Sequence, residues 1–361
     1  MAPLATLRRR VARLSALALC ALSASPLAAV PVAAQAGEAA AAWHPGAPAE
    51  LFEVVEVVDG DTLHVLRGGR LEKLRLASVD TEEKLSSGAS RDPLKPRTVF
   101  GEECALWAKR FFADLAEDGA RPKVGLLFPD AAAAGGERSR EARDVYGRLL
   151  CHVILPDGRD FNLLLVQLGK SPYYNKYGND LLCHEAFVAA QREARARKIG
   201  IWDPRTNRPR TAGAPRARRD YARLLAWWEA RAQAVEAYRA RRADNPAGTA
   251  DAEDPASLSA AARSGDEVAV FCSVDRLFDE RDGSLTVLMR AVEPERALRV
   301  SLAAERRGAF DAHELARRSE PFRQNYLWAH GRLERDRRGW RMEVSEPSRL
   351  ALAGPEPALR D

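Results

Sequence analysis

The 361-residue chain has 46% hydrophobic and 30% charged residues, which is enough apolar material for packed cores and excludes a globally disordered protein. Its length fits two domains with connecting segments rather than one small module. The formal net charge of +5 would suggest a nucleic-acid partner, but four arginines within the first 13 residues supply most of it. The rest of the chain is therefore close to neutral, and bulk charge identifies no partner.

Residues 1–36 match the pattern of a secretory signal peptide. A basic end from Arg8 to Arg13 precedes an apolar run from Leu14 to Val32, and the segment closes with Ala34-Gln35-Ala36. We therefore expect cleavage after Ala36 and export to the periplasm, the cell surface or the exterior, with no stable membrane partner afterwards. An uncleaved membrane anchor is the alternative, although two prolines interrupt the apolar run.

The cysteines beyond this segment show no metal-binding pattern. None of the four has the paired Cys-x-x-Cys spacing of a zinc site. An oxidising compartment would permit a disulfide, but the sequence assigns no pairing among them. They are Cys104, Cys151, Cys183 and Cys272.

The first folded domain is expected over residues 51–204, after a flexible lead-in over 37–50. Its predicted strands come first, and its two clearest helical patterns close the domain. The strands are expected at 52–58, 61–66, 72–79, 123–128 and 148–155, an amphipathic stretch at 101–115, and the helices at 161–168 and 182–198. This order predicts an α+β domain in which a small barrel or sheet carries helices on one side.

Residues 205–246 have a different composition, with eleven arginines and only four acidic residues. Apolar residues recur at helical spacing between Leu224 and Tyr238, which predicts a basic amphipathic helix. This helix is either an arm that faces phosphates or a linker helix that packs its aromatic face on a neighbour. Residues 247–264 are rich in Ala, Asp, Gly, Pro and Ser, and are predicted to be a linker.

A second domain is predicted over residues 265–352. Its β-type runs fall at 267–276, 284–292, 298–302, 326–333 and 340–344, with a helix at 309–317 between the third and the fourth. Three strands, a helix and two more strands is the order of an OB-fold barrel. Many OB-folds bind oligonucleotides, but this domain is close to neutral and has no basic field to support such binding.

Acidic residues of the first domain gather near the ends of predicted strands. Asp59 and Asp61 flank a glycine just before one strand, and Asp80 follows the next strand along the chain. Residues 67–70 read as the turn of a hairpin between these two strands. An antiparallel pairing would bring Asp61 and Asp80 to the same end, so that two carboxylates face one small space.

Converging carboxylates repel one another, and a bound hard cation commonly resolves the repulsion. Oxygen-only ligands favour Ca²⁺ or Mg²⁺ over zinc. Glu83 lies on the turn after Asp80 and is a candidate general base for a water molecule. Arg75 and Arg148 offer two guanidinium groups, which suit a phosphodiester because its transition state gathers negative charge on the equatorial oxygens.

An ordered set of motifs extends this pattern across the whole domain. They are Val58-Asp-Gly-Asp-Thr62, Arg75-Leu-x-x-Val-Asp-Thr-x-Glu83, Gly101-Glu-Glu-x-Ala105, Tyr146-Gly-Arg148, Asn162-x-x-Leu-Val-x-x-Gly169 and Ile199-Gly-Ile-Trp202. In this order they resemble the staphylococcal-nuclease-like, or thermonuclease, family over residues 51–204. The resemblance covers less than half of the chain.

The resemblance implies a fold and an activity. The fold is an OB-like five-stranded barrel with three helices. The activity is that of an endonuclease, a hydrolase whose Ca²⁺-dependent cleavage of DNA or RNA phosphodiester bonds leaves 3′-phosphate ends. One Ca²⁺ ion is expected, with Mg²⁺ the less favoured metal.

By position, the resemblance also assigns roles to individual residues. It implies that Asp61, Asp80 and the Thr81 carbonyl ligate the metal. It further implies that Arg75 and Arg148 bind phosphate and that Glu83 is the catalytic glutamate.

Three further residues concern substrate binding and a departure from the family. Tyr174 and Tyr177 fall where the family has tyrosines that line the nucleotide pocket, and packing is the alternative role for both. Glu82 stands where the family usually has proline, which adds flexibility and a negative charge beside Glu83.

The alternative function is a catalytically inactive nucleic-acid-binding or scaffold protein that retains the nuclease fold. In that case the second barrel and the basic helix would form the contact surface. Members that lose catalysis usually lose these acids and arginines, and this chain has kept them. The sequence therefore favours the enzyme, and it identifies no protein partner. His64 and His152 are expected on barrel faces without a role in the site.

Overall fold

The computed structural model describes residues 43–88, 92–116, 119–129, 141–208, 219–291 and 296–359. The expected signal peptide and the start of the lead-in lie outside the described residues, as do residues 130–140. Within the described ranges, no helix is both long and apolar enough to cross a membrane.

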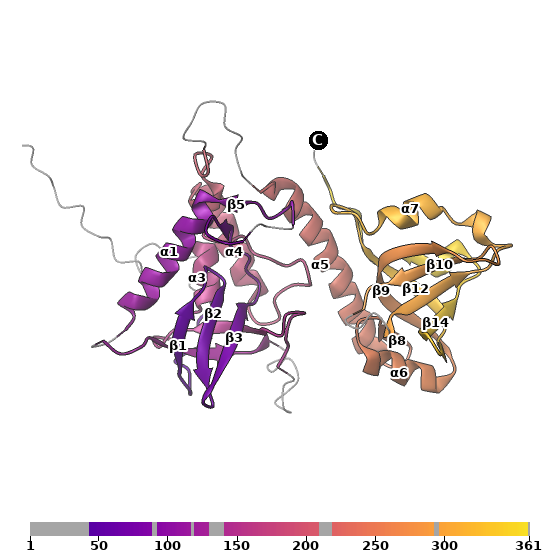
Figure 1. Cartoon of the computed structure of the whole chain (residues 1–361), viewed down its shortest axis with the longest axis horizontal. Coiled ribbons are helices and arrows are strands. Elements are labelled where there is room, and N and C mark those ends of the chain that lie inside the picture. The colour runs from indigo at the N-terminus through magenta and orange to yellow at the C-terminus, as the bar shows by residue number, and fades with distance from the viewer. Residues whose placement is uncertain are drawn as a thin grey trace, which may run out of the picture. The chain divides into compact units, whose positions relative to one another are not determined.

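The first domain is a closed five-stranded barrel, as the sequence predicted (Figure 1). Its hydrogen-bonded order is β1-β2-β3-β7-β6, and β3 and β7 are the parallel pair. The strands are β1 (Phe52–Val57), β2 (Thr62–Arg67), β3 (Arg70–Leu76), β6 (Lys123–Leu127) and β7 (Leu149–Ile154). Helices α1 (Val99–Asp114), α3 (Phe161–Gln167) and α4 (His184–Ala196) complete the OB-like α+β domain, with a 3-10 turn η3 (Gly200–Trp202) and the short strands β4 (Glu83–Lys84) and β5 (Arg97–Thr98).

Alternating burial explains why these segments form a barrel. Leu63, Val65 and Leu74 point inward and are fully buried, whereas their neighbours along the strands are partly exposed. Asn162 at the start of α3 joins two strands, because its side-chain amide donates to the carbonyl oxygens of Ala77 and Cys151 at 2.9 and 3.0 Å. These two hydrogen bonds of Asn162 hold the end of β3 next to β7.

The described part of the predicted flexible lead-in is held against this barrel. The indole of Trp43 donates a hydrogen bond to Asp160 at 3.2 Å. A Cβ on Gly158 would lie 2.4 Å from the ring of His44, so the two segments are in close contact. Trp43 and His44 of the lead-in therefore contact the first domain, which the composition of the segment does not reveal.

The basic segment forms helix α5 (Tyr221–Asp244), and its described arginines contact protein groups. Arg231 donates to the carbonyl oxygen of Lys176 at 3.1 Å and to Asn325 at 2.7 Å. Trp227 and Trp228 are buried. These contacts agree with a helix that packs its aromatic face on its neighbours, rather than with an arm that faces phosphates.

The second domain has the strand order expected of an OB-fold. Its third and fifth principal strands, β11 and β14, are parallel, as are β3 and β7 in the first barrel. The order is β13-β14-β11-β10-β9-β12-β15, which leaves the ladder open between β12 and β14 in the described chain. The elements are β9 (Glu267–Asp279), β10 (Leu285–Met289), β11 (Leu298–Leu302), η5 (Arg307–Ala309), α7 (Ala312–Arg317), β12 (Tyr326–Arg332), β13 (Glu334–Asp336), β14 (Gly339–Glu343), η6 (Pro347–Arg349) and β15 (Leu350–Leu352).

The predicted linker over residues 247–264 is instead part of the second domain. Strand β8 (Thr249–Asp251) pairs in parallel with β9, and helix α6 (Pro255–Ser264) follows it. Asp254 caps this helix by accepting a hydrogen bond from the Ala256 amide, and Leu258 is fully buried in the core. The small and polar composition that suggested a linker therefore belongs to a capped helix with a narrow apolar face.

Candidate active site

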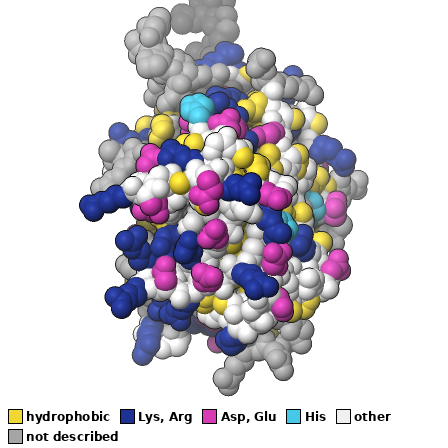
Figure 2. All heavy atoms as spheres, turned by 90° about the vertical axis from the view of Figure 1, so that its right-hand side faces the viewer, with side chains coloured by type: hydrophobic (Ala, Val, Ile, Leu, Met, Phe, Trp, Pro, Cys, Tyr) yellow, Lys and Arg dark blue, Asp and Glu magenta, His cyan; other side chains and the backbone are white. Residues whose placement is uncertain are grey.

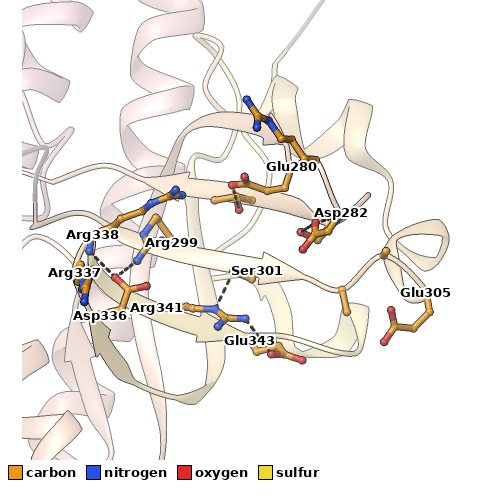
Figure 3. Close-up of a pocket in the computed structure, with 15 residues that line it drawn as sticks. Glu280, Asp282, Arg299, Ser301, Glu305, Asp336, Arg337, Arg338, Arg341 and Glu343 are labelled. Atoms are coloured by element: carbon orange, nitrogen blue, oxygen red, sulfur yellow. Dashed lines mark hydrogen bonds and ion pairs between the residues drawn. The ribbon is translucent and has the colours of Figure 1, made fainter.

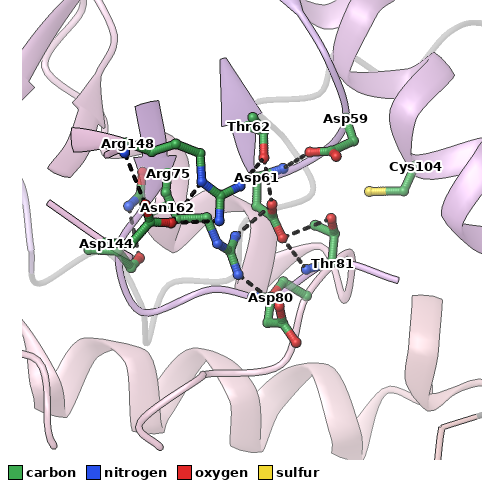
Figure 4. Close-up of polar contacts among 12 residues, drawn as sticks. Asp59, Asp61, Thr62, Arg75, Asp80, Thr81, Cys104, Asp144, Arg148 and Asn162 are labelled. Carbon is green, nitrogen blue, oxygen red and sulfur yellow. Dashed lines mark hydrogen bonds and ion pairs between the residues drawn. The ribbon is translucent and has the colours of Figure 1, made fainter. Parts of the chain in front are cut away.

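The two predicted aspartates converge on one arginine. Thr62 pairs with Arg75 across β2 and β3, which brings the start of one strand beside the end of the other. Nη1 of Arg75 lies 2.5 Å from Oδ1 of Asp61, and its Nη2 lies 2.7 Å from Oδ1 of Asp80 (Figure 4). Although burial alone would lower the pKa of Arg75, the two carboxylates raise it above its usual range.

Thr81 fixes the other oxygen of Asp61. Its amide and its hydroxyl both donate to Oδ2, at 2.7 and 3.1 Å. Gly60 allows this close approach, because a Cβ there would lie 2.6 Å from the Thr81 side chain and 2.8 Å from the sulfur of Cys104. The glycine between Asp59 and Asp61 is therefore needed for packing at the site.

Asp59 is the least compensated acid of the group. Its carboxylate accepts a hydrogen bond from the Asp61 amide at 3.2 Å, and the Thr62 side chain also interacts with it. Burial, and next the negative charge of Asp61, raise the pKa of Asp59 to about 7. Burial and the neighbouring carboxylate thus both oppose ionisation of Asp59.

Asp80 lies among three cations, two of which the sequence did not identify. Lys95 contacts Oδ1 at 2.7 Å, and Arg219 contacts Oδ2 at 2.6 Å. Burial alone would raise the pKa of Asp80, but Arg219, Lys95 and Arg75 lower it well below its usual range. Arg219 is 139 residues from Asp80 along the chain, so no local pattern could have found it.

Arg148 reaches the same edge of the barrel from the start of β7. Its Nε donates to Asp144 at 2.7 Å, and its Nη1 lies 3.5 Å from the Thr62 hydroxyl (Figure 4). That hydroxyl donates to Asp61 at 3.1 Å. Arg75 and Arg148 are therefore linked to one carboxylate, and Arg148 is the more accessible of the two.

Glu83 and Glu82 have separate surroundings. Glu83 is half-buried on β4, and burial raises the pKa of its carboxyl above the usual value. A Cβ on Gly101 would lie 2.2 Å from the Glu83 carbonyl oxygen, so α1 packs directly on this residue. The Glu82 carboxylate is buried and accepts hydrogen bonds from Thr98 at 2.5 Å, from Asn207 at 2.6 Å and from Tyr221 at 3.0 Å.

Glu82 is therefore a structural carboxylate. The expectation that it adds flexibility beside Glu83 was wrong, because three hydrogen bonds hold its side chain in the direction of α5 and of the start of α1.

The two predicted stacking tyrosines differ in exposure. Tyr174 packs edge-on against Trp228 of α5, with ring centroids 4.8 Å apart, and burial raises its pKa well above the usual value. Tyr177 is 61% exposed. Their own ring centroids lie 5.9 Å apart. Tyr174 is thus partly buried against the core, whereas the ring of Tyr177 is exposed.

A second polar cluster lies in the core of the first domain. His152 is fully buried, with Nδ1 2.7 Å from Asp160 and Nε2 2.9 Å from Asp180. Burial would lower its pKa, but Asp160 and then Asp180 raise it to about 10, so the ring is a charged imidazolium. Cys183 lies close enough to complete a metal-ligand set, but both ring nitrogens are already engaged. The cluster is therefore a buried ion-pair network.

The four described cysteines are all free and buried. Cys104 lies at the edge of the site (Figure 4), and burial raises the pKa of its thiol to about 12. A buried thiol held neutral in this way is a packing residue rather than a nucleophile.

A polar cleft of about 1080 Å³ lies on the second domain. Its lining combines five arginines with five acidic residues (Figure 3), and two of the arginines pair with acids of the cleft, Arg299 with Asp336 and Arg341 with Glu343. Figure 2 shows basic and acidic side chains interspersed over the face of the molecule that it views. The cleft thus lacks the basic field of a nucleic-acid groove.

The donor set at Asp61 and Asp80 fits a hard cation. Oδ1 of each carboxylate contacts the Arg75 guanidinium, and carboxylate oxygens are the ligands that a hard cation prefers. Asp59 adds a third carboxylate beside this pair, and burial, followed by the charge of Asp61, raises its pKa. Groups that already contact these oxygens oppose the fit at both acids. Arg75 and Thr62 contact Oδ1 of Asp61, Thr81 donates twice to its Oδ2, and Lys95 and Arg219 bind Asp80.

The first domain is thus a closed OB-like barrel that holds a group of carboxylates and guanidinium groups at one edge. Residues 73–204 match the family model described as "Staphylococcal nuclease homologue". These residues therefore form a domain of the staphylococcal-nuclease-like family.

Curated relatives agree with this assignment. A thermonuclease of Staphylococcus hyicus is 29% identical over 42% of this chain and 76% of its own length. A thermonuclease of Staphylococcus intermedius is 28% identical, over 43% and 77%. An uncharacterized endonuclease of Escherichia coli O157:H7 is 27% identical, over 41% and 74%. These names support a nuclease.

Proposed function

We propose that the protein is an exported Ca²⁺-dependent endonuclease that hydrolyses phosphodiester bonds of DNA or RNA and leaves 3′-phosphate ends. The observation that carries the proposal is the pair of guanidinium groups, Arg75 and Arg148, at the carboxylate pair Asp61 and Asp80. Both the phosphate-binding charges and the oxygen ligands of a hard cation are thus present at one barrel edge. Export rests on the signal-peptide pattern of residues 1–36.

Each residue of the site has a separate role in the proposed hydrolysis. Asp61, Asp80 and the Thr81 carbonyl would hold the metal, which supplies Lewis-acid stabilisation of the phosphoryl oxygens. Arg148 and Arg75 bind the phosphate and stabilise the charge that grows on its equatorial oxygens. Glu83 takes a proton from the attacking water, and its raised pKa makes it a stronger base than an exposed glutamate. Tyr177 offers an exposed ring on which a base stacks.

The direct test is hydrolysis of single-stranded DNA and of RNA by the purified protein without residues 1–36. We expect cleavage with Ca²⁺, loss of cleavage with a chelator, and recovery when Ca²⁺ is restored. End-group analysis of the products should find 3′-phosphates. Absence of metal-dependent cleavage between pH 7 and 10 would instead favour the inactive nucleic-acid-binding or scaffold protein.

Arg148→Ala is expected to lower turnover by about 10²–10³-fold, because it removes one charged donor from the transition state. Its loss should cost about 1 kcal/mol of stability at most, since the pair with Asp144 is partly exposed. Arg143→Ala is the matched control, because Arg143 pairs with Glu72 outside the site. Steady-state kinetics and thermal unfolding of both variants check this. Equal turnover in the two variants would exclude Arg148 from the chemistry.

A further inference from the structure

Arg219 reaches the site from outside the family domain. The match to the nuclease family ends at residue 204, and Arg219 lies just before α5. Its Nη2 is 2.6 Å from Oδ2 of Asp80, and its Nη1 donates to the Asp80 carbonyl oxygen at 3.1 Å. Both side chains are only 2% exposed. This is a buried two-point contact with an expected metal ligand.

The remaining oxygen of Asp80 is also engaged. Oδ1 accepts from Arg75 and from Lys95, both at 2.7 Å, which uses both of its lone pairs. A metal ion at Oδ1 must therefore displace Arg75 or Lys95. Lys95 is 29% exposed and can swing into water at little cost.

Arg219 has no such freedom. Its guanidinium lies 5.6 Å from the ring centroid of Tyr221 and 5.7 Å from that of Trp228. The helix that follows it is anchored by the Trp227 indole, which donates to the carbonyl oxygen of Arg323 at 2.7 Å. An arginine also keeps its charge at every physiological pH. The positive charge beside Asp80 therefore remains when a metal ion arrives.

We propose that Arg219 is a positioning residue of the active site that competes with the metal ion for the negative charge of Asp80, and thereby sets the metal affinity. The inference rests on the proposed function. Two positive charges near one buried carboxylate repel each other, and at separations of a few ångströms this repulsion changes an affinity by tenfold or more. The segment that leads into α5 thus keeps metal binding weaker than the acids alone would make it.

The test is calorimetric titration of Ca²⁺ into the protein without residues 1–36, with no nucleic acid present. Arg219→Gln should bind Ca²⁺ at least about tenfold more tightly than the wild type. Tyr221→Phe is the matched control. It removes the hydrogen bond that the Tyr221 hydroxyl donates to Glu82 and leaves every charge in place. Its dissociation constant should equal that of the wild type.

A second variant covers the case in which Arg219→Gln does not fold. Arg219→Met removes the same charge and keeps an unbranched stem that can pack on Tyr221 and Trp228, so it should tighten binding by a similar factor. Circular dichroism confirms that each variant is folded. Unchanged or weaker Ca²⁺ binding in whichever Arg219 variant folds would overturn the inference.

The Ca²⁺ titration can be interpreted separately from the measurement of hydrolysis. If Ca²⁺ binds more tightly in Arg219→Gln but no variant cleaves DNA or RNA, the competition stands and the proposed nuclease function fails. If the wild type cleaves with Ca²⁺ and the affinity of Arg219→Gln is unchanged, the function stands and the competition fails.

Discussion

Glu83→Gln is expected to lower turnover by about 10³-fold, within the range found for loss of a general base. The substitution keeps the size of the side chain and removes its ability to accept a proton. Because Glu83 is half-buried and no hydrogen bond involving its side chain was found among the described residues, the free energy of unfolding should change by less than about 1 kcal/mol. Steady-state kinetics and urea unfolding measure the two quantities separately.

The neighbouring glutamate provides the control. Glu82→Gln alters a buried carboxylate that accepts three hydrogen bonds, so it should destabilise the fold by about 1–3 kcal/mol. Its turnover per folded molecule should stay within a few-fold of the wild type. The role of Glu83 would have to be abandoned if its Gln variant kept wild-type turnover, or if both variants lost activity equally.

His152→Gln is expected to be the most destabilising of these substitutions, at about 3–5 kcal/mol near pH 6. The imidazolium separates the buried carboxylates of Asp160 and Asp180, at 2.7 and 2.9 Å. A neutral amide leaves two negative charges in the core without a cation. His64→Gln is the control, because His64 pairs with the exposed Glu56 and should cost less than about 1 kcal/mol.

The contribution of His152 should also depend on pH with a defined sign. Its folded-state pKa, about 10, lies above the ordinary value of 6.5. The proton therefore stabilises the fold fully below pH 6.5, and this stabilisation is lost as the pH rises towards 10. Urea unfolding at pH 6 and pH 9.5 should show a smaller difference between wild type and His152→Gln at the higher pH. A difference that grows with pH would mean that the ring is neutral in the core.

The nuclease barrel and the inner part of its site followed from local patterns. The hairpin turn at residues 67–70 fixes the pairing of β2 with β3, which brings Asp61 to Arg75. Asp80 follows the end of β3, and its amide donates to the Ser171 hydroxyl at 2.8 Å. Alternating apolar residues located the strands because each has one buried face. Asp61, Arg75 and Asp80 lie within 20 residues of one another along the chain, so their spacing in the sequence was enough to predict that they come together.

The outer part of the site depends on contacts that sequence spacing does not encode. Arg219 and Tyr221 reach Asp80 and Glu82 across 139 residues each. Their residue types are ordinary for a basic helix, and only the packing of α5 decides where they lie. For the same reason, a helix with a two-residue apolar face at Leu258 and Ala261 was mistaken for a linker.

The contacts of Arg231 determine the smallest fragment that can carry the complete site. This residue binds the Lys176 carbonyl oxygen in the first domain and Asn325 in the second. A protein cut after residue 204 would lose Arg219 and Tyr221. One cut after α5 would keep them but would uncover Trp227, whose indole partners are Arg323 and Asn325. A fragment that keeps Arg219, Tyr221 and every partner of α5 therefore contains both barrels, and a boundary at residue 204 would remove two side chains that contact Asp80 and Glu82.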